Sequence, residues 1–229
     1  MGFLGANMDT DSWTYAEKLE QKVRELLDGY NFGHSYAHAE RVWDLSQKII
    51  DGEDIFVDYE VVYAASLLHD VGYIVNNPKD PKKFRHPDES VKIAKKILPE
   101  LGFPKKKMPK TLEAILLHDD IKPWGRMRHS TYAEVWIVQD ADCIETFGFK
   151  GIQRIMDYGK RVGMKLYDKN LRWDDPDAKD KSILHNIQAH IDIYERLNTV
   201  TARKIAKPLI NQMTHYIEKQ LPKLSSLQL

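Results

Sequence analysis

The chain has 229 residues, of which 42% are hydrophobic, and its 34 basic and 34 acidic side chains give a formal charge of +0 at pH 7. This length and hydrophobic content suffice for one large domain with its own core. The balanced charge excludes a general attraction to nucleic acid or to anionic membranes, so we expect neither as a partner.

Cysteine content and hydrophobic runs indicate the cellular setting. The single cysteine, Cys143, excludes an internal disulfide framework and suits a reducing compartment. The first ten residues lack the basic and apolar regions of a signal peptide, and no stretch approaches the roughly 18 consecutive apolar residues of a membrane span. We therefore expect a soluble, unprocessed protein of the cytoplasm without a disulfide partner.

The hydrophobic pattern predicts an all-α fold. Apolar residues recur at intervals of three and four, while alternating runs of β-branched residues are nearly absent. We expect a compact bundle of about eight to ten helices that forms a single domain over residues 1–229.

Two amphipathic helices are predicted first. Residues 14–28 form one, which Gly29 ends. Residues 36–50 form the next, and His38 shares its apolar stripe with Val42. His38 is therefore expected to face the core.

The following helices carry histidine and aspartate at their ends. Residues 58–70 are apolar on most sides and finish with His69 and Asp70. A later helix begins near Pro87, which suits a first helical position, and His86 then serves as its N-cap.

Residues further along the chain extend this pattern. The next helix ends with His118 and Asp119, after an apolar run. Residues 131–147 read as a helix that is apolar on nearly all sides but carries Asp140 and Asp142. Such a helix is expected in the middle of a bundle, where buried acids need partners. Helices at 182–198 and 201–220 close the chain and are expected to pack on the preceding ones.

The residue types at these buried positions suit a metal site. Imidazole and carboxylate ligands together bind divalent transition metals and leave positions open for water and substrate. Asp140 and Asp142 lie about 200° apart around a helix, so only one of them is expected to face the metal. Periodicity does not choose between them. Nor does it choose the ion, which could be Mn, Fe, Co, Ni or Zn.

The order of these residues resembles the HD-domain superfamily of metal-dependent phosphohydrolases. Residues 34–42 look like the opening motif of that family and residues 67–72 like its central motif. Residues 139–154 are similar to a bacterial and archaeal branch of HD hydrolases. The motif core spans residues 34–156.

The resemblance implies roles for individual residues. It favours Asp142 over Asp140 as a ligand, because the family's aspartate precedes a variable and then an aliphatic residue. Asp140 would then lie outside the ligand set and support it, and His34 would either do the same or only begin its helix. The implied metal ligands are His38, His69, Asp70 and Asp142.

Two more histidines leave the number of metals open. Some members of the superfamily hold a second metal with two further histidines, and the HD aspartate bridges the two ions. His86 and His118 fit that order, and Asp70 would be the bridge. A related branch with six such ligands binds two irons and oxidises small molecules with O₂.

The implied activity is hydrolysis of a phosphoester or phosphoanhydride in a nucleotide or similar small phosphorylated metabolite. A metal-activated water would attack phosphorus, and Arg41, Arg85 and Arg154 are candidates to neutralise the developing charge. His86 or His118 could act as general acid if no second metal occupies them. The alternatives are a dinuclear iron oxygenase and a non-catalytic nucleotide-sensing module. Oligomeric state is not predicted, and the substrate depends on the loops at 73–85, 121–129 and 161–181.

Overall fold

The computed structural model describes residues 13–28, 34–75, 85–175 and 177–226, without the side chains of the last five. These residues form nine α-helices and no β-strand, which confirms the all-α prediction. The expected loop at 73–85 lies largely outside the described residues. The helices are α1 (Ala16–Leu27), α2 (Tyr36–Gly52), α3 (Tyr59–Leu68), α4 (His86–Glu100), α5 (Met108–Leu117), α6 (Ala133–Glu145), α7 (Gly148–Val162), α8 (Ile183–Ile193) and α9 (Val200–Ser226).

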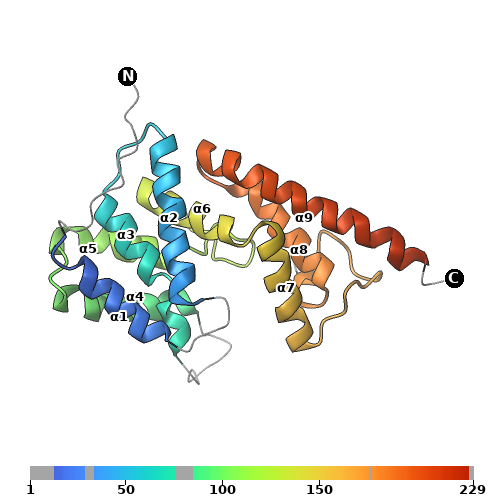
Figure 1. Cartoon of the computed structure of the whole chain (residues 1–229), viewed down its shortest axis with the longest axis horizontal. Coiled ribbons are helices and arrows are strands. Elements are labelled where there is room, and N and C mark those ends of the chain that lie inside the picture. The colour runs from blue at the N-terminus through green and yellow to red at the C-terminus, as the bar shows by residue number, and fades with distance from the viewer. Residues whose placement is uncertain (1–12, 29–33, 76–84, 176, 227–229) are drawn as a thin grey trace.

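Two groups of helices meet at α6 (Figure 1). Helices α1 to α5 gather around α6 on one side, and α7, α8 and α9 pack together on the other. Helices α3 and α6 are buried on nearly all sides, because their sequences are apolar around the whole circumference. Every ligand-type residue predicted from the sequence lies in the first group or on α6.

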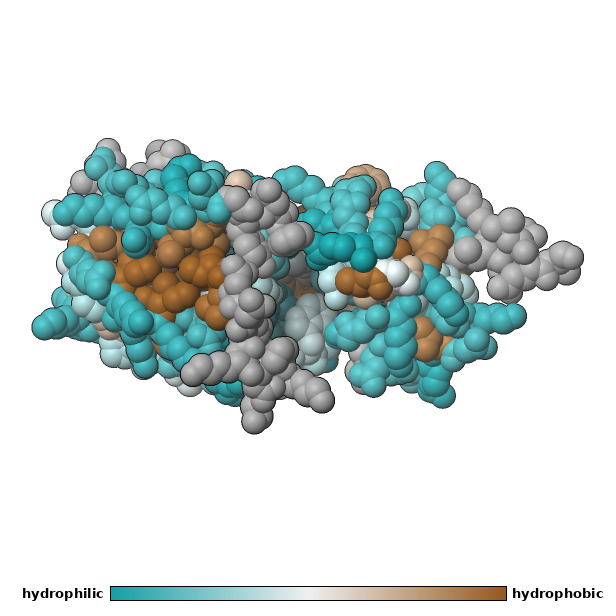
Figure 2. Space-filling model, turned by 90° about the horizontal axis from the view of Figure 1, so that it is seen from below, coloured by the Kyte–Doolittle hydropathy of each residue, from teal (hydrophilic) through white to brown (hydrophobic). Residues whose placement is uncertain are grey.

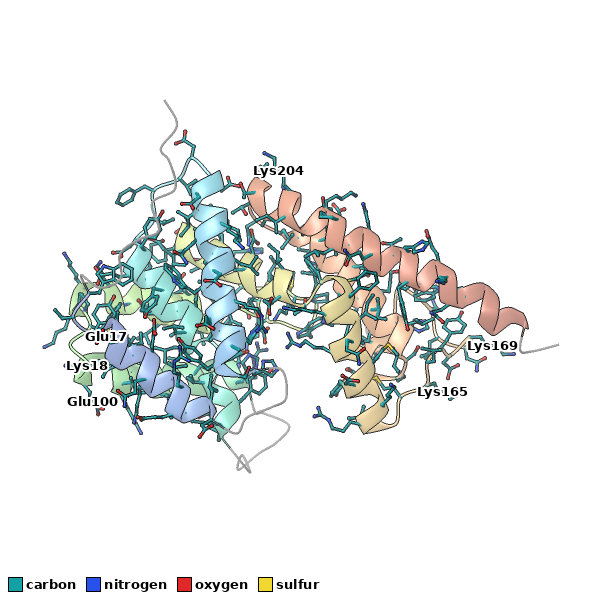
Figure 3. All side chains as sticks on the ribbon, in the orientation of Figure 1. Glu17, Lys18, Glu100, Lys165, Lys169 and Lys204 are labelled. Atoms are coloured by element: carbon teal, nitrogen blue, oxygen red, sulfur yellow. The ribbon has the colours of Figure 1, made fainter. Side chains whose placement is uncertain are left out.

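The surface follows the amphipathic pattern. Charged residues such as Glu17, Glu100 and Lys165 point outward from the ribbon (Figure 3). Hydrophilic residues cover most of the face in Figure 2, where the largest apolar patch lies at the end formed by α1 to α5 and smaller ones lie on the other half. No described helix is long and apolar enough to cross a membrane.

Several helix boundaries differ from the sequence prediction, and α9 extends to Ser226, beyond the predicted end at 220. Arg85, and not His86, is the N-cap of α4, so His86 is the first helical residue and Pro87 follows it in the first turn. Proline is tolerated there because the amide hydrogen it lacks would have no partner within the helix. The expected helix over 182–198 divides into α8 and a short 3₁₀ turn, Tyr194–Arg196.

Helix α7 was not among the predicted helices. It contains Gly148, Gly151 and Gly159, and glycine is a poor helix former. Gly151 is nevertheless required, because a Cβ atom there would lie 1.8 Å from the carbonyl oxygen of Thr146. Close packing at the junction of α6 and α7 therefore favours glycine over better helix formers.

Candidate metal centre

The His69–Asp70 pair lies where the chain leaves α3. His69 caps the helix, and Asp70 precedes a short 3₁₀ turn, Val71–Ile74. Gly72 lets this turn approach α4, since a Cβ atom at that position would lie 2.0 Å from the carbonyl oxygen of His86. The glycine after the pair thus allows His86 to come close to Asp70.

Four residues predicted as ligands form a first cluster. Nε2 of His38 lies 3.2 Å from Nε2 of His69 and 3.3 Å from an oxygen of both Asp70 and Asp142. All four side chains are buried. Residues from α2, the end of α3 and α6 therefore meet at one point.

A second cluster adjoins the first. Nε2 of His86 lies 3.0 Å from Nε2 of His118 and 3.3 Å from Oδ2 of Asp119. Asp70 connects the clusters, because its Oδ2 faces His38 and His69 while its Oδ1 lies 3.3 Å from His86 and 3.6 Å from His118.

Backbone contacts orient two of the histidine rings. Nδ1 of His69 donates to the carbonyl oxygen of Ser66 at 2.8 Å, and Nδ1 of His118 donates to that of Ile115 at 2.7 Å. A carbonyl oxygen only accepts, so the proton is on Nδ1. Nε2 of each ring faces its cluster and is the atom available to bind a metal.

The spacing of the donor atoms fits metal coordination. Ligands at about 2.1 Å from an ion, with angles between about 90° and 110°, lie about 3.0–3.4 Å from one another. The shortest separations between donors in the two clusters, 3.0–3.3 Å, fall in that range, and others are longer, at 3.6–3.9 Å. The residues present therefore fit one divalent ion in each cluster, with an oxygen of Asp70 in both.

The charges are coupled across the first cluster. Although burial opposes ionisation, His69 and His34 hold the pKa of Asp70 well below its usual range. Lys122 and His38 do the same for the pKa of Asp142. Burial favours the neutral ring of His38, but its contacts with Asp142 and Asp70 raise its pKa to about 10. A proton on this ring thus balances the carboxylates that would bind a cation.

Two residues at the centre were not identified from the sequence. Asp119 belongs to the second cluster, and Lys122 places its buried ammonium 2.6 Å from an oxygen of Asp119 and of Asp142. Asp119 follows His118 after an apolar run, as Asp70 follows His69, and that parallel could have identified it. No sequence pattern marks Lys122, because its role depends on how the end of α5 packs against α6.

The structure separates Asp140 from Asp142. Asp140 accepts hydrogen bonds of 2.8–2.9 Å from the backbone and side chains of Asn198 and Thr199, just before α9. Burial raises its pKa to about 6 despite these bonds. Asp142, two residues on, points to the first cluster.

His34 lies beside the first cluster. Its Nδ1 is 2.5 Å from Oδ2 of Asp70, and its ring stacks on Tyr73 at a centroid distance of 4.0 Å. Tyr73 in turn stacks on His86 at 4.0 Å. These rings cover the side of the centre that faces the main cavity.

The three candidate arginines lie in different places. Arg154 lines the main cavity, which measures about 610 Å³. Arg85 lies 3.6 Å from Asp120, beside a smaller cavity near His86. Arg41 donates to Glu145 at 2.6 Å and lines a separate groove between α2 and α9. Other residues of the main cavity are His34, Tyr73, Asp119, Lys122, Trp124 and His190.

Comparison with known proteins assigns the family. The model of the HD domain matches residues 35–146, a segment that contains both clusters, so this chain contains an HD domain. No curated relative was detected.

Solved structures share the fold over nearly the whole chain. A protein of Lactobacillus plantarum has a TM-score of 0.73 at 19% identity, covering 93% of this chain and 98% of its own. An HD-superfamily hydrolase of Bacillus thuringiensis has a TM-score of 0.67 at 22% identity, covering 92% and 96%. Bacillus subtilis YpgQ, solved in complex with ADP, has a TM-score of 0.64 at 25% identity, covering 91% and 94%.

Proposed function

We propose that this HD-domain protein is a metal-dependent phosphohydrolase that acts on a nucleotide or a similar small phosphorylated metabolite. The observation that carries the proposal is the convergence of His38, His69, Asp70 and Asp142 beside a cavity of about 610 Å³. Cavities of this volume accommodate small-molecule ligands.

The ligand set defines what a metal would do here. His38, His69, Asp70 and Asp142 would hold a divalent ion, which supplies a nucleophilic water near neutral pH and polarises a phosphoryl oxygen. A divalent ion that takes five or six ligands would keep one or two positions for water or substrate beside these four residues.

Cationic side chains of the chain complete the site. Lys122 and Arg154 both line the main cavity. Burial disfavours the charged form of Lys122, but Asp119 and Asp142 outweigh it and raise its pKa well above the usual range, so the ammonium stays charged. Fixed positive groups next to a transferring phosphoryl group stabilise the charge that develops on its oxygens. We propose these two residues for that role, and not Arg41, which points to another groove.

The cavity also favours a nucleotide among phosphorylated metabolites. Nη1 of Arg154 is buried and has no hydrogen-bond partner among the described residues. Trp124 and His190, with ring centroids 5.1 Å apart, provide an aromatic wall for a planar group. The ADP complex of YpgQ, at 25% identity, is in line with this substrate class.

A second candidate function follows from the second cluster. His86, His118 and Asp119 offer a further set of donors next to Oδ1 of Asp70. A dinuclear iron oxygenase would use such a pair of sites. Two irons per chain with O₂ consumption and no phosphate release would favour this alternative.

A phosphate-release screen with nucleotides and sugar phosphates tests the primary proposal. We expect hydrolysis that requires added Mn²⁺, Co²⁺ or another divalent ion and that falls at least about 10³-fold in Asp70→Ala. Glu17→Gln, on the exposed face of α1, is the control. Hydrolysis that survives both chelation and Asp70→Ala would refute the proposal, and tight nucleotide binding without turnover would instead indicate a sensing module.

A further inference from the structure

The Nδ1 atom of His38 has a different surrounding from the Nδ1 atoms of His69 and His118. His69 and His118 each donate Nδ1–H to a backbone carbonyl one turn earlier. Nδ1 of His38 is buried without a hydrogen-bond partner among the described residues. The backbone of α2 therefore does not set the orientation of this ring.

The acidic group that faces this atom belongs to Glu145. Its Oε2 lies 3.7 Å from Nδ1 of His38, longer than a hydrogen bond but close for a charge in a buried setting. The side chain of Glu145 is 10% exposed. Glu145 is the last residue of α6, the helix that also carries Asp142. One helix thus presents a carboxylate to each side of the same imidazole.

Arg41 holds that carboxylate in place. It lies three residues after His38 on α2, and its Nε donates to Oε2 of Glu145 at 2.6 Å. Its side chain is 38% exposed and reaches Glu145 from the groove between α2 and α9. Arg41 and Glu145 both line this groove, and neither lines the main cavity.

An ionised carboxylate at this distance stabilises the tautomer that the ring would need to bind a metal through Nε2. A lone pair on Nδ1 would face negative charge and is disfavoured, whereas a proton on Nδ1 is attracted. The neutral ring then carries its lone pair on Nε2, which faces His69, Asp70 and Asp142. A carboxylate behind a metal-bound histidine also increases the basicity of the ligand.

We propose that Glu145 is a positioning residue for His38, and that Arg41 acts through Glu145 and not on the substrate. The proposal rests on the first cluster being a metal site, as the proposed function requires. Arg41, which lies in the opening motif, would thus support His38, the metal ligand on the same helix.

Metal affinity measures this role directly. In Glu145→Gln, which keeps the shape of the side chain and removes its charge, we expect the dissociation constant for Mn²⁺ or Zn²⁺ to rise about 10- to 100-fold. Arg41→Gln should produce a smaller rise in the same direction. The control is Asp44→Asn, which lines the same groove but is not part of the Arg41–Glu145 ion pair, and it should remain within about twofold of wild type.

Nitrogen NMR of the histidine rings separates positioning from general stability. In the Zn²⁺-loaded wild type, His38 should show a metal-bound Nε2 and an Nδ1 proton whose resonance is shifted downfield by the facing carboxylate, and in Glu145→Gln this resonance should move upfield. Unchanged affinity and an unchanged Nδ1 proton resonance in both Glu145→Gln and Arg41→Gln would overturn the proposal. A wild-type protein without a tight metal site would instead overturn the proposed function, and this inference with it.

Discussion

The buried lysine is the residue at the centre with the clearest energetic role. Lys122 neutralises Asp119 and Asp142 without any metal, and removal of one member of a buried ion pair costs about 3–5 kcal/mol. Lys122→Met should therefore lower the unfolding free energy of the metal-free protein by about that amount. Urea unfolding after chelation measures the change, with Lys165→Met on the surface as control. A loss below about 0.5 kcal/mol would show that the carboxylates have other compensation.

His38 gives the centre a defined pH dependence. Without metal its pKa is about 10, because its contacts with Asp142 and Asp70 outweigh burial, so Nε2 carries a proton near neutrality. An ion must displace that proton, and metal affinity should rise by up to about tenfold per pH unit between about pH 6 and 8. Isothermal titration with Zn²⁺ in buffers of different ionisation enthalpy also counts the proton released. An affinity independent of pH would contradict the assignment of His38 as a ligand.

At the scale of elements, the turn after α3 determines whether the two clusters can adjoin. A Cβ atom on Gly72 would lie 2.0 Å from His86 O and 2.7 Å from Ser90 N, both backbone atoms that cannot easily move. Gly72→Ala should destabilise the protein by about 1–3 kcal/mol and weaken metal binding by shifting His86. Gly163→Ala is the control, because its φ of 76° disfavours alanine through backbone strain alone, with no atom within 4 Å of an added Cβ. If both variants bind metal equally well, the close approach of Gly72 to α4 does not determine the position of His86.

The helices and site residues that the sequence could predict are those with a local signal. Apolar periodicity placed His38 on the buried face of α2, and the all-apolar pattern around Asp142 predicted a central helix, because both signals are local. The resemblance to the family supplied the preference for Asp142 over Asp140. The partners Lys122 and Glu145 could not be predicted, because they depend on how α5, α6 and α2 approach one another. Helix α7 was missed because its glycines serve packing rather than helix propensity.

At the scale of the whole molecule, Asp140 connects the two groups of helices. It lies on α6 and accepts hydrogen bonds from Asn198 and Thr199 at the start of α9. The single domain over residues 1–229 stays a prediction, and cooperative unfolding tests it. We expect one transition in the wild type, and in Asp140→Ala a loss of about 2–4 kcal/mol with earlier unfolding of α9. Two separate transitions in the wild type would show that the C-terminal helices form a unit of their own.

Metal content is the measurement that tests the central claim most directly. After reconstitution with a divalent transition metal and dialysis, the wild-type protein should retain at least one ion per chain, and a second would indicate that the His86 cluster is also filled. His69→Ala should lose the ion of the first cluster while remaining folded. Equal metal content in the wild type and His69→Ala, or none in the wild type, would contradict the account of this centre.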